Sequence, residues 1–91
     1  MRTKYLFFIT VLWSLFSIVA WGQSVAAQGE KAYTEQNYVD AVVFFKKAVQ
    51  ETPTAENYYN WGNANYRLKQ YSEAVIAYLL CLRIDPANEY A

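Results

Sequence analysis

"WGNANYRLKQYSEAVIAYLLCLRIDPAN", residues 61–88, is the second copy of a pattern that first occurs at residues 28–55, QGEKAYTEQNYVDAVVFFKKAVQETPTA. The two stretches align without a gap, and the members of each matched pair are 33 residues apart. Self-similarity at a fixed period of this size is the signature of an array of structural repeats. The matched pairs are Gly29 with Gly62, Tyr33 with Tyr66, Tyr38 with Tyr71, Ala41-Val42 with Ala74-Val75, Phe45 with Tyr78, Ala48 with Cys81, and Pro53 with Pro86.

Each copy predicts two helices. In the second copy, one face of a helix is indicated by the i, i+3, i+4, i+7 spacing of Tyr58, Trp61, Gly62, Asn65 and Leu68. The pattern breaks at KQYSE and resumes from Ser72 to Arg83. Asp85-Pro86 then ends the second helix, because the residue before a proline is pushed out of the helical region. The inner stripe of this helix is predicted to be Ala74, Val75, Tyr78, Leu79 and Leu82.

The first copy follows the same plan. Its second helix stops at Thr52-Pro53, and the turns are short, so the helices of each pair must pack antiparallel. The inner stripe is predicted to be Tyr38, Ala41, Val42, Phe45, Ala48 and Val49.

Small side chains indicate where the helices cross. Paired helices approach to about 8–10 Å only where the side chains at the crossing are small. We expect such crossings at Gly29, Gly62, Ala41 and Ala74, with core aromatic rings beside them at Tyr33, Phe45, Tyr66 and Tyr78.

This spacing of glycine, aromatic, alanine and proline residues resembles the tetratricopeptide repeat family, over Val25 to Ala91. The resemblance implies an all-α fold with two tandem helix-turn-helix repeats, at 28–55 and 56–87, in a short right-handed α-solenoid. Residues 88–91 would begin a truncated third helix pair. The period is 33 rather than the family's 34. Ala32 and Asn65 stand where the family usually has an aromatic residue, and Cys81 replaces an alanine as a buried packing residue.

The N-terminal segment, residues 1–27, reads as a secretory signal peptide. A basic start precedes an uncharged run of 17 residues, 5–21, and small residues follow. We expect an apolar signal helix, cleavage after Ala27 (or after Gly22 or Ala26), and an exported, periplasmic or secreted product. The alternative is an uncleaved membrane anchor, for which about 20 apolar residues are the norm. The arrangement is also similar to exported tetratricopeptide proteins of bacterial aerotolerance (Bat) operons, which share a "YYNxGNAxY" stretch.

Few kinds of chemistry fit this set of residues. The chain has no histidine and one cysteine, and it has no CxxC, HExxH or glycine-rich phosphate loop. We therefore predict no enzyme activity, no metal and no cofactor. From Gln28 onward there are six basic and eight acidic residues, a net charge of −2 without a basic stripe, so nucleic acid is not an expected partner. Contact with a membrane is expected only if residues 5–21 remain as an anchor.

Binding of a protein or peptide is the function that the resemblance implies, because the first helices of such repeats line a concave groove. An asparagine side chain there can clamp a peptide backbone, since it both donates and accepts hydrogen bonds. Glu30 occupies the position matching Asn63, so a clamp for a C-terminal carboxylate is not expected. The candidate groove residues are Tyr59, Asn60, Asn63, Tyr66 and Arg67 in the second repeat and Glu30, Tyr33 and Thr34 in the first.

The C-terminal end predicts an open helix face. Leu79, Leu80 and Leu82 have no following helix to cover them, and repeats of this kind bury their faces on neighbours. Three interpretations stay open: a fragment of a longer protein, self-association through residues 79–91, or a minimal module of two repeats. The alternative function is therefore a structural assembly unit that self-associates through this helix.

Overall fold

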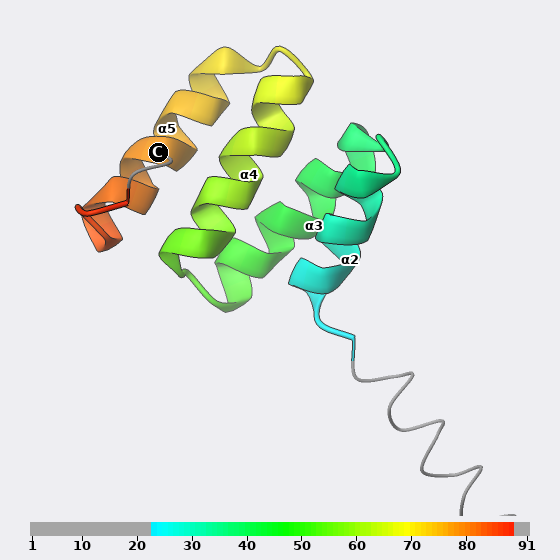
Figure 1. Ribbon diagram of the computed structural model, residues 1–91, viewed down its shortest axis with the longest axis horizontal. Helices are drawn as coiled ribbons and strands as arrows, with labels where there is room; N and C mark the ends of the chain where they lie inside the picture. Colours follow the sequence, from blue (N-terminus) through cyan, green and yellow to red (C-terminus); the bar gives the residue numbers. More distant parts are fainter. Residues whose placement is uncertain (1–22, 89–91) are drawn as a thin grey trace, which may run out of the picture.

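The computed structural model describes residues 23–88, which form two antiparallel helix pairs and contain no strand (Figure 1). The predicted all-α fold with two helix pairs is therefore confirmed. The predicted signal helix and the residues beyond Asn88 lie outside the described residues. No helix within 23–88 is long and apolar enough to cross a membrane. The helices are α2 (Val25–Thr34), α3 (Tyr38–Glu51), α4 (Ala55–Arg67) and α5 (Tyr71–Ile84).

Side-chain caps begin three of the four helices. The backbone N–H of Ala27 donates to Ser24 Oγ over 3.1 Å at the start of α2, which supplies a partner that the helix itself lacks. Asn37 and Thr54 cap α3 and α4 in the same way. Helix α2 thus begins three residues before the expected repeat boundary at Gln28. Cleavage after Ala27 would remove this cap and the first turn, whereas cleavage after Gly22 would leave both.

The turn within each repeat has the same geometry. Gln36 and Lys69, which are 33 residues apart, have φ angles of 62° and 61°. The next residue then donates its N–H back into the helix, from Asn37 to the Ala32 carbonyl over 2.8 Å and from Gln70 to the carbonyl of Asn65 over 2.9 Å. This is the left-handed helix ending that glycine usually provides. Here Gln36 and Lys69 adopt this backbone conformation instead of glycine. The sequence therefore contains no glycine that would mark these turns.

Glycine and an aromatic ring form the closest contact within each repeat. A Cβ atom built on Gly29 would lie 2.7 Å from the Phe45 ring, and one built on Gly62 would lie 2.6 Å from the Tyr78 ring. The two contacts join α2 to α3 and α4 to α5. Ala41 and Ala74 are buried beside them, which confirms the predicted crossings.

The two repeats share one apolar cluster. It contains the buried residues Ala32, Ala41, Phe45 and Ala64, and Trp61 packs against it. Trp61 belongs to α4 and packs on the core of the first repeat. Its indole Nε1 is buried and has no hydrogen-bond partner within the described part of the chain. Burying an unpaired donor costs about 1–3 kcal/mol, so this contact joins the repeats through apolar area alone.

Asn65 is the polar residue of the core. It occupies the position equivalent to Ala32 and is 1% exposed. Its Nδ2 donates to the backbone carbonyl of Trp61 one turn earlier, over 2.9 Å. This buried amide is therefore bound by a backbone carbonyl of its own helix.

The outer side of α5 differs from the prediction. Val75 and Leu79 were placed on the inner stripe, yet they are 54% and 61% exposed, while Ala77 and Cys81 are buried. On α3 the equivalent of Val75, Val42, is half-buried because α4 follows α3. Among the described residues no helix covers α5 in this way. The rest of the predicted stripe is correct, since Ala74 is buried and Tyr78 and Leu82 are half-buried. The error is confined to Val75 and Leu79, because α5 is apolar around most of its circumference and its pattern marks the edge of the buried face poorly.

Tyr66 was also predicted as a core ring and is 57% exposed. It lies at the end of α4, where its ring meets that of Tyr71 edge-on at 5.5 Å between centroids. Its equivalent in the first repeat, Tyr33, is half-buried against the shared cluster. The difference arises because α4 follows the first repeat and no described helix follows the second.

Gly62→Ala is expected to lower the free energy of unfolding of the full-length chain by about 1–3 kcal/mol, because the new methyl group overlaps the Tyr78 ring. This cost exceeds the gain of up to about 1 kcal/mol from the better helix propensity of alanine. Urea denaturation followed by circular dichroism measures the change. In a Tyr78→Ala background the same substitution should become stabilising. A stabilised Gly62→Ala chain with Tyr78 present would contradict the proposed overlap.

Candidate functional site

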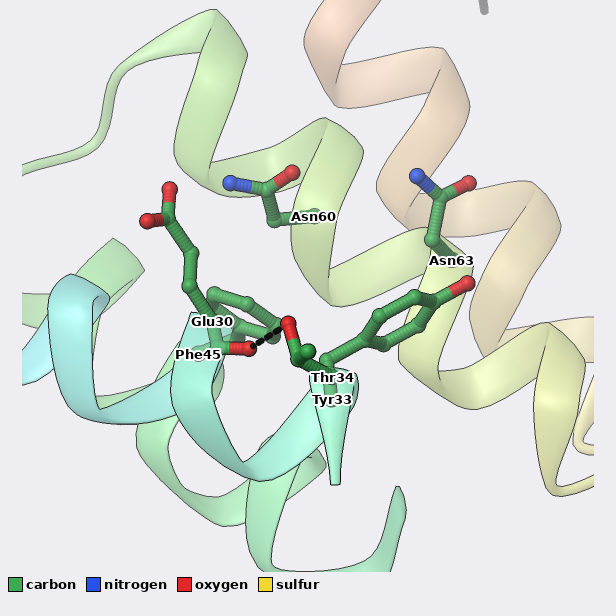
Figure 2. A pocket seen from close by; sticks show the side chains of 6 residues that line it. All are labelled: Glu30, Tyr33, Thr34, Phe45, Asn60 and Asn63. Atoms are coloured by element: carbon green, nitrogen blue, oxygen red, sulfur yellow. Dashed lines mark hydrogen bonds between the residues drawn. The ribbon is translucent and has the colours of Figure 1, made fainter. Parts of the chain in front are cut away.

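A pocket of about 260 Å³ lies between α2 and α4. Both helices are the first of their repeats, so the pocket occupies the groove position expected from the sequence. Figure 2 shows the side chains of Asn60 and Asn63 on one wall and those of Glu30 and Tyr33 on the other. The residues that line it are Glu30, Tyr33, Thr34, Phe45, Asn60 and Asn63.

Asn63 is held in one orientation by α5. The Tyr78 hydroxyl donates to Asn63 Oδ1 over 2.6 Å. Because the amide oxygen accepts this bond, the two N–H groups of Nδ2 remain available as donors. In Figure 2 the nitrogen of Asn63 is turned toward Asn60 and the oxygen away from it. The second repeat thus presents an oriented hydrogen-bond donor to the pocket.

The Tyr78 phenol is protonated at neutral pH and can donate this bond, and its partial burial extends the protonated form to higher pH. Burial raises the pKa of Tyr78, and the neighbouring Tyr59 raises it further. The rings of the two tyrosines lie 5.9 Å apart in a tilted arrangement. Tyr59, a predicted groove residue, therefore packs beside Tyr78 and does not line this pocket.

The first repeat presents a different group. Phe45 takes the place of Tyr78 and has no hydroxyl, and Glu30 takes the place of Asn63. Glu30 is exposed, and its carboxylate projects from α2 at the pocket (Figure 2). The Thr34 hydroxyl donates to the Glu30 backbone carbonyl over 2.9 Å, so that hydroxyl is engaged with its own helix.

Arg67 joins the repeats. Its Nε donates to the Tyr33 hydroxyl over 3.1 Å, and its guanidinium carbon lies 5.9 Å and 5.8 Å from the ring centroids of Tyr33 and Tyr38. Those two rings meet edge-on at 5.2 Å. The hydrogen bond that Arg67 donates to Tyr33 is the largest cause that raises the pKa of Arg67. Arg67 was predicted as a groove residue, and it fixes the Tyr33 wall rather than lining the pocket.

The structure thus brings together five of the residues named from the sequence, Glu30, Tyr33, Thr34, Asn60 and Asn63, and leaves Tyr59, Tyr66 and Arg67 outside this pocket. Phe45 lines the pocket and was predicted only as a core residue. Its equivalence to Tyr78 could have revealed this role. Each of these rings crosses a helix at a glycine, and such a ring reaches the face of that helix on which the pocket lies.

Other chemistry has little basis in the described residues. No group of three or more histidine, cysteine, aspartate or glutamate side chains within 23–88 could hold a metal ion. The Cys81 thiol is buried, and burial raises its pKa, which keeps it protonated and weakly nucleophilic.

Tyr78→Phe is expected to lower the free energy of unfolding at pH 7 by about 0.5–1.5 kcal/mol through loss of the bond to Asn63. The pKa of Tyr78 is raised in the folded chain, so its contribution is complete below the pKa of an unfolded tyrosine, about 10, and is lost as the pH rises through the folded value. Urea denaturation at both pH 8 and pH 11 measures how much stability each chain loses between these two pH values. This loss should be smaller for Tyr78→Phe than for the wild type. An equal loss in both chains would be inconsistent with this assignment.

Comparison with known proteins agrees with this geometry. Residues 55–88, which include α4, α5 and the turn between them, match the family profile described as Tetratricopeptide repeat. A search of curated proteins finds no match to the chain. Residues 55–88 are therefore a tetratricopeptide repeat, and the prediction of that family from the sequence is confirmed.

Proposed function

We propose that this chain is a protein-interaction module that holds an extended peptide segment in the pocket between α2 and α4. Tetratricopeptide repeats generally mediate contacts between proteins, which supports a protein or peptide partner. The observation that carries the proposal is the oriented amide of Asn63 on the pocket wall, with its oxygen occupied by Tyr78 and its nitrogen free to donate.

A peptide backbone offers a carbonyl and an N–H group, and the asparagine side chains on the α4 wall can bind both. Its carbonyl accepts from Asn63 Nδ2, while Asn60, one turn earlier on the same helix, supplies a second amide. The Tyr33 ring forms the facing wall and is fixed by Arg67. Two rigid helices therefore position the binding groups before the peptide arrives, which lowers the entropy cost of binding.

The test uses a random peptide display library and the purified full-length chain. Peptides selected by the wild type are labelled, and their affinity is measured by fluorescence anisotropy. Asn60→Ala and Asn63→Ala should each weaken binding by about threefold to tenfold, the loss of one hydrogen bond, with an unchanged circular dichroism spectrum. Gln50→Ala, which removes an exposed amide on α3 away from the pocket, is the matched control. Unchanged affinity in both pocket variants would refute the proposed groove.

A second candidate function is self-association, which the exposed apolar side of α5 favours. Val75, Ile76, Leu79 and Ile84 are each half or more exposed. The apolar residues by which α4 covers the first repeat, Trp61 and Ala64, correspond to Gln28 and Lys31 in α2. Helix α2 of another copy would therefore place an amide and an ammonium group on an apolar surface. A symmetric contact between two α5 helices avoids this cost, so we propose that form of the assembly.

Analytical ultracentrifugation across a range of concentrations tests the assembly. The wild type should form a dimer that dissociates on dilution, and Leu79→Glu should be monomeric because the new carboxylate would be buried at the contact. Val43→Glu, at a similarly exposed valine on α3, should still dimerise. A wild type that is monomeric at every concentration, or a Leu79→Glu variant that dimerises as well as the wild type, would rule out this contact.

A further inference from the structure

The two repeats place different groups at equivalent positions of the pocket. At position 63 an amide stands above a tyrosine, and 33 residues earlier, at position 30, a carboxylate stands above a phenylalanine. The phenol of Tyr78 binds the amide oxygen, whereas Phe45 has no group that could bind a carboxylate. The α4 wall therefore carries the neutral amide of Asn63, whose oxygen is hydrogen-bonded to Tyr78. The α2 wall carries the charged carboxylate of Glu30, which receives no hydrogen bond from the ring of Phe45.

Glu30 sets the electrostatic character of the pocket. The other five lining residues are neutral at pH 7: two asparagines, a tyrosine, a threonine and a phenylalanine. The cation that contacts this wall, Arg67, donates to the Tyr33 hydroxyl and lies over two tyrosine rings. Glu30 forms no ion pair with another described residue. An acidic ligand group in the pocket would meet this carboxylate and be repelled, and a cationic group would be attracted.

We propose that the occupant is a peptide with a lysine or arginine side chain, whose cation pairs with Glu30 while a backbone carbonyl of the same peptide accepts from Asn63. This inference rests on the proposed groove function and adds the chemistry of the ligand. The donor, Asn63, and the acceptor, Glu30, lie on opposite walls of the pocket (Figure 2). A peptide that contacts both must therefore lie in the pocket between α2 and α4. The basic side chain is thereby on the α2 side and the bound carbonyl on the α4 side.

The size of the effect follows from the exposure of Glu30. A solvent-exposed ion pair changes an affinity by only a few fold, and salt screens it. The carboxylate therefore selects among peptides more than it strengthens binding, while the amides hold any backbone. Selection of peptide sequences is accordingly a sharper readout of Glu30 than a single affinity.

The experiment selects peptides from the random display library separately with the full-length wild type, Glu30→Gln and Glu30→Lys. Wild-type selections should be enriched in lysine and arginine. Glu30→Gln should lose this enrichment, and Glu30→Lys should select aspartate and glutamate instead. Glu35→Gln, which neutralises another exposed acid next to α2 outside this pocket, should select as the wild type does. Replacing the selected lysine by norleucine should weaken wild-type binding about threefold at low salt and less at 0.5 M salt.

The outcomes separate the two proposals. Peptides that bind the wild type and are lost with Asn63→Ala, but show the same composition with Glu30→Gln, would overturn the basic ligand and leave the groove standing. Enrichment of basic residues that persists in Glu30→Gln and vanishes in Glu35→Gln would also overturn it, since the charge would act elsewhere. Failure of every chain to select any peptide would overturn the groove and the inference together.

Discussion

The contact between Gly62 and the Tyr78 ring is the constraint on which the second repeat depends. Helices α4 and α5 approach so closely there that a Cβ atom would overlap the ring. The same contact occurs between Gly29 and Phe45 in the first repeat, so the two repeats share this close crossing. A small residue is required because the ring passes beneath the helix to its far side, where the pocket lies.

The crossing of the Tyr78 ring beneath α4 links the fold to the site. The ring of Tyr78 packs within the second repeat, while its hydroxyl emerges beside Asn63 and fixes the amide that faces the pocket. A residue that a sequence pattern assigns to packing thus also orients a candidate binding group. The opposite wall depends on a contact between repeats, since Tyr33 is fixed by Arg67 from α4. The pocket therefore requires both repeats to be folded and docked.

The helix pairs and the glycine crossings could be predicted from the sequence because they follow from a local period. The contacts that depend on a neighbouring helix could not. Trp61 packs on the core of the first repeat. Val75 is exposed where its equivalent Val42 is half-buried, because α4 follows α3 and no described helix follows α5. The site was predicted in part for the same reason. The helical positions of Asn60 and Asn63 pointed to the groove, whereas the contact of Arg67 with Tyr33 joins residues 34 apart, which no local pattern indicates.

The repeats differ most where packing constrains them least. Positions at the crossings retain small side chains, with Ala41 matched by Ala74 and Ala48 by Cys81, because a larger group would separate the helices. The pocket position is an acid in one repeat and an amide in the other, and neither choice disturbs the helices beneath. A pocket built from two such repeats can therefore carry unlike groups on its two walls without loss of the fold. In the proposed complex, this asymmetry would give a bound peptide a direction, which two identical walls would not do.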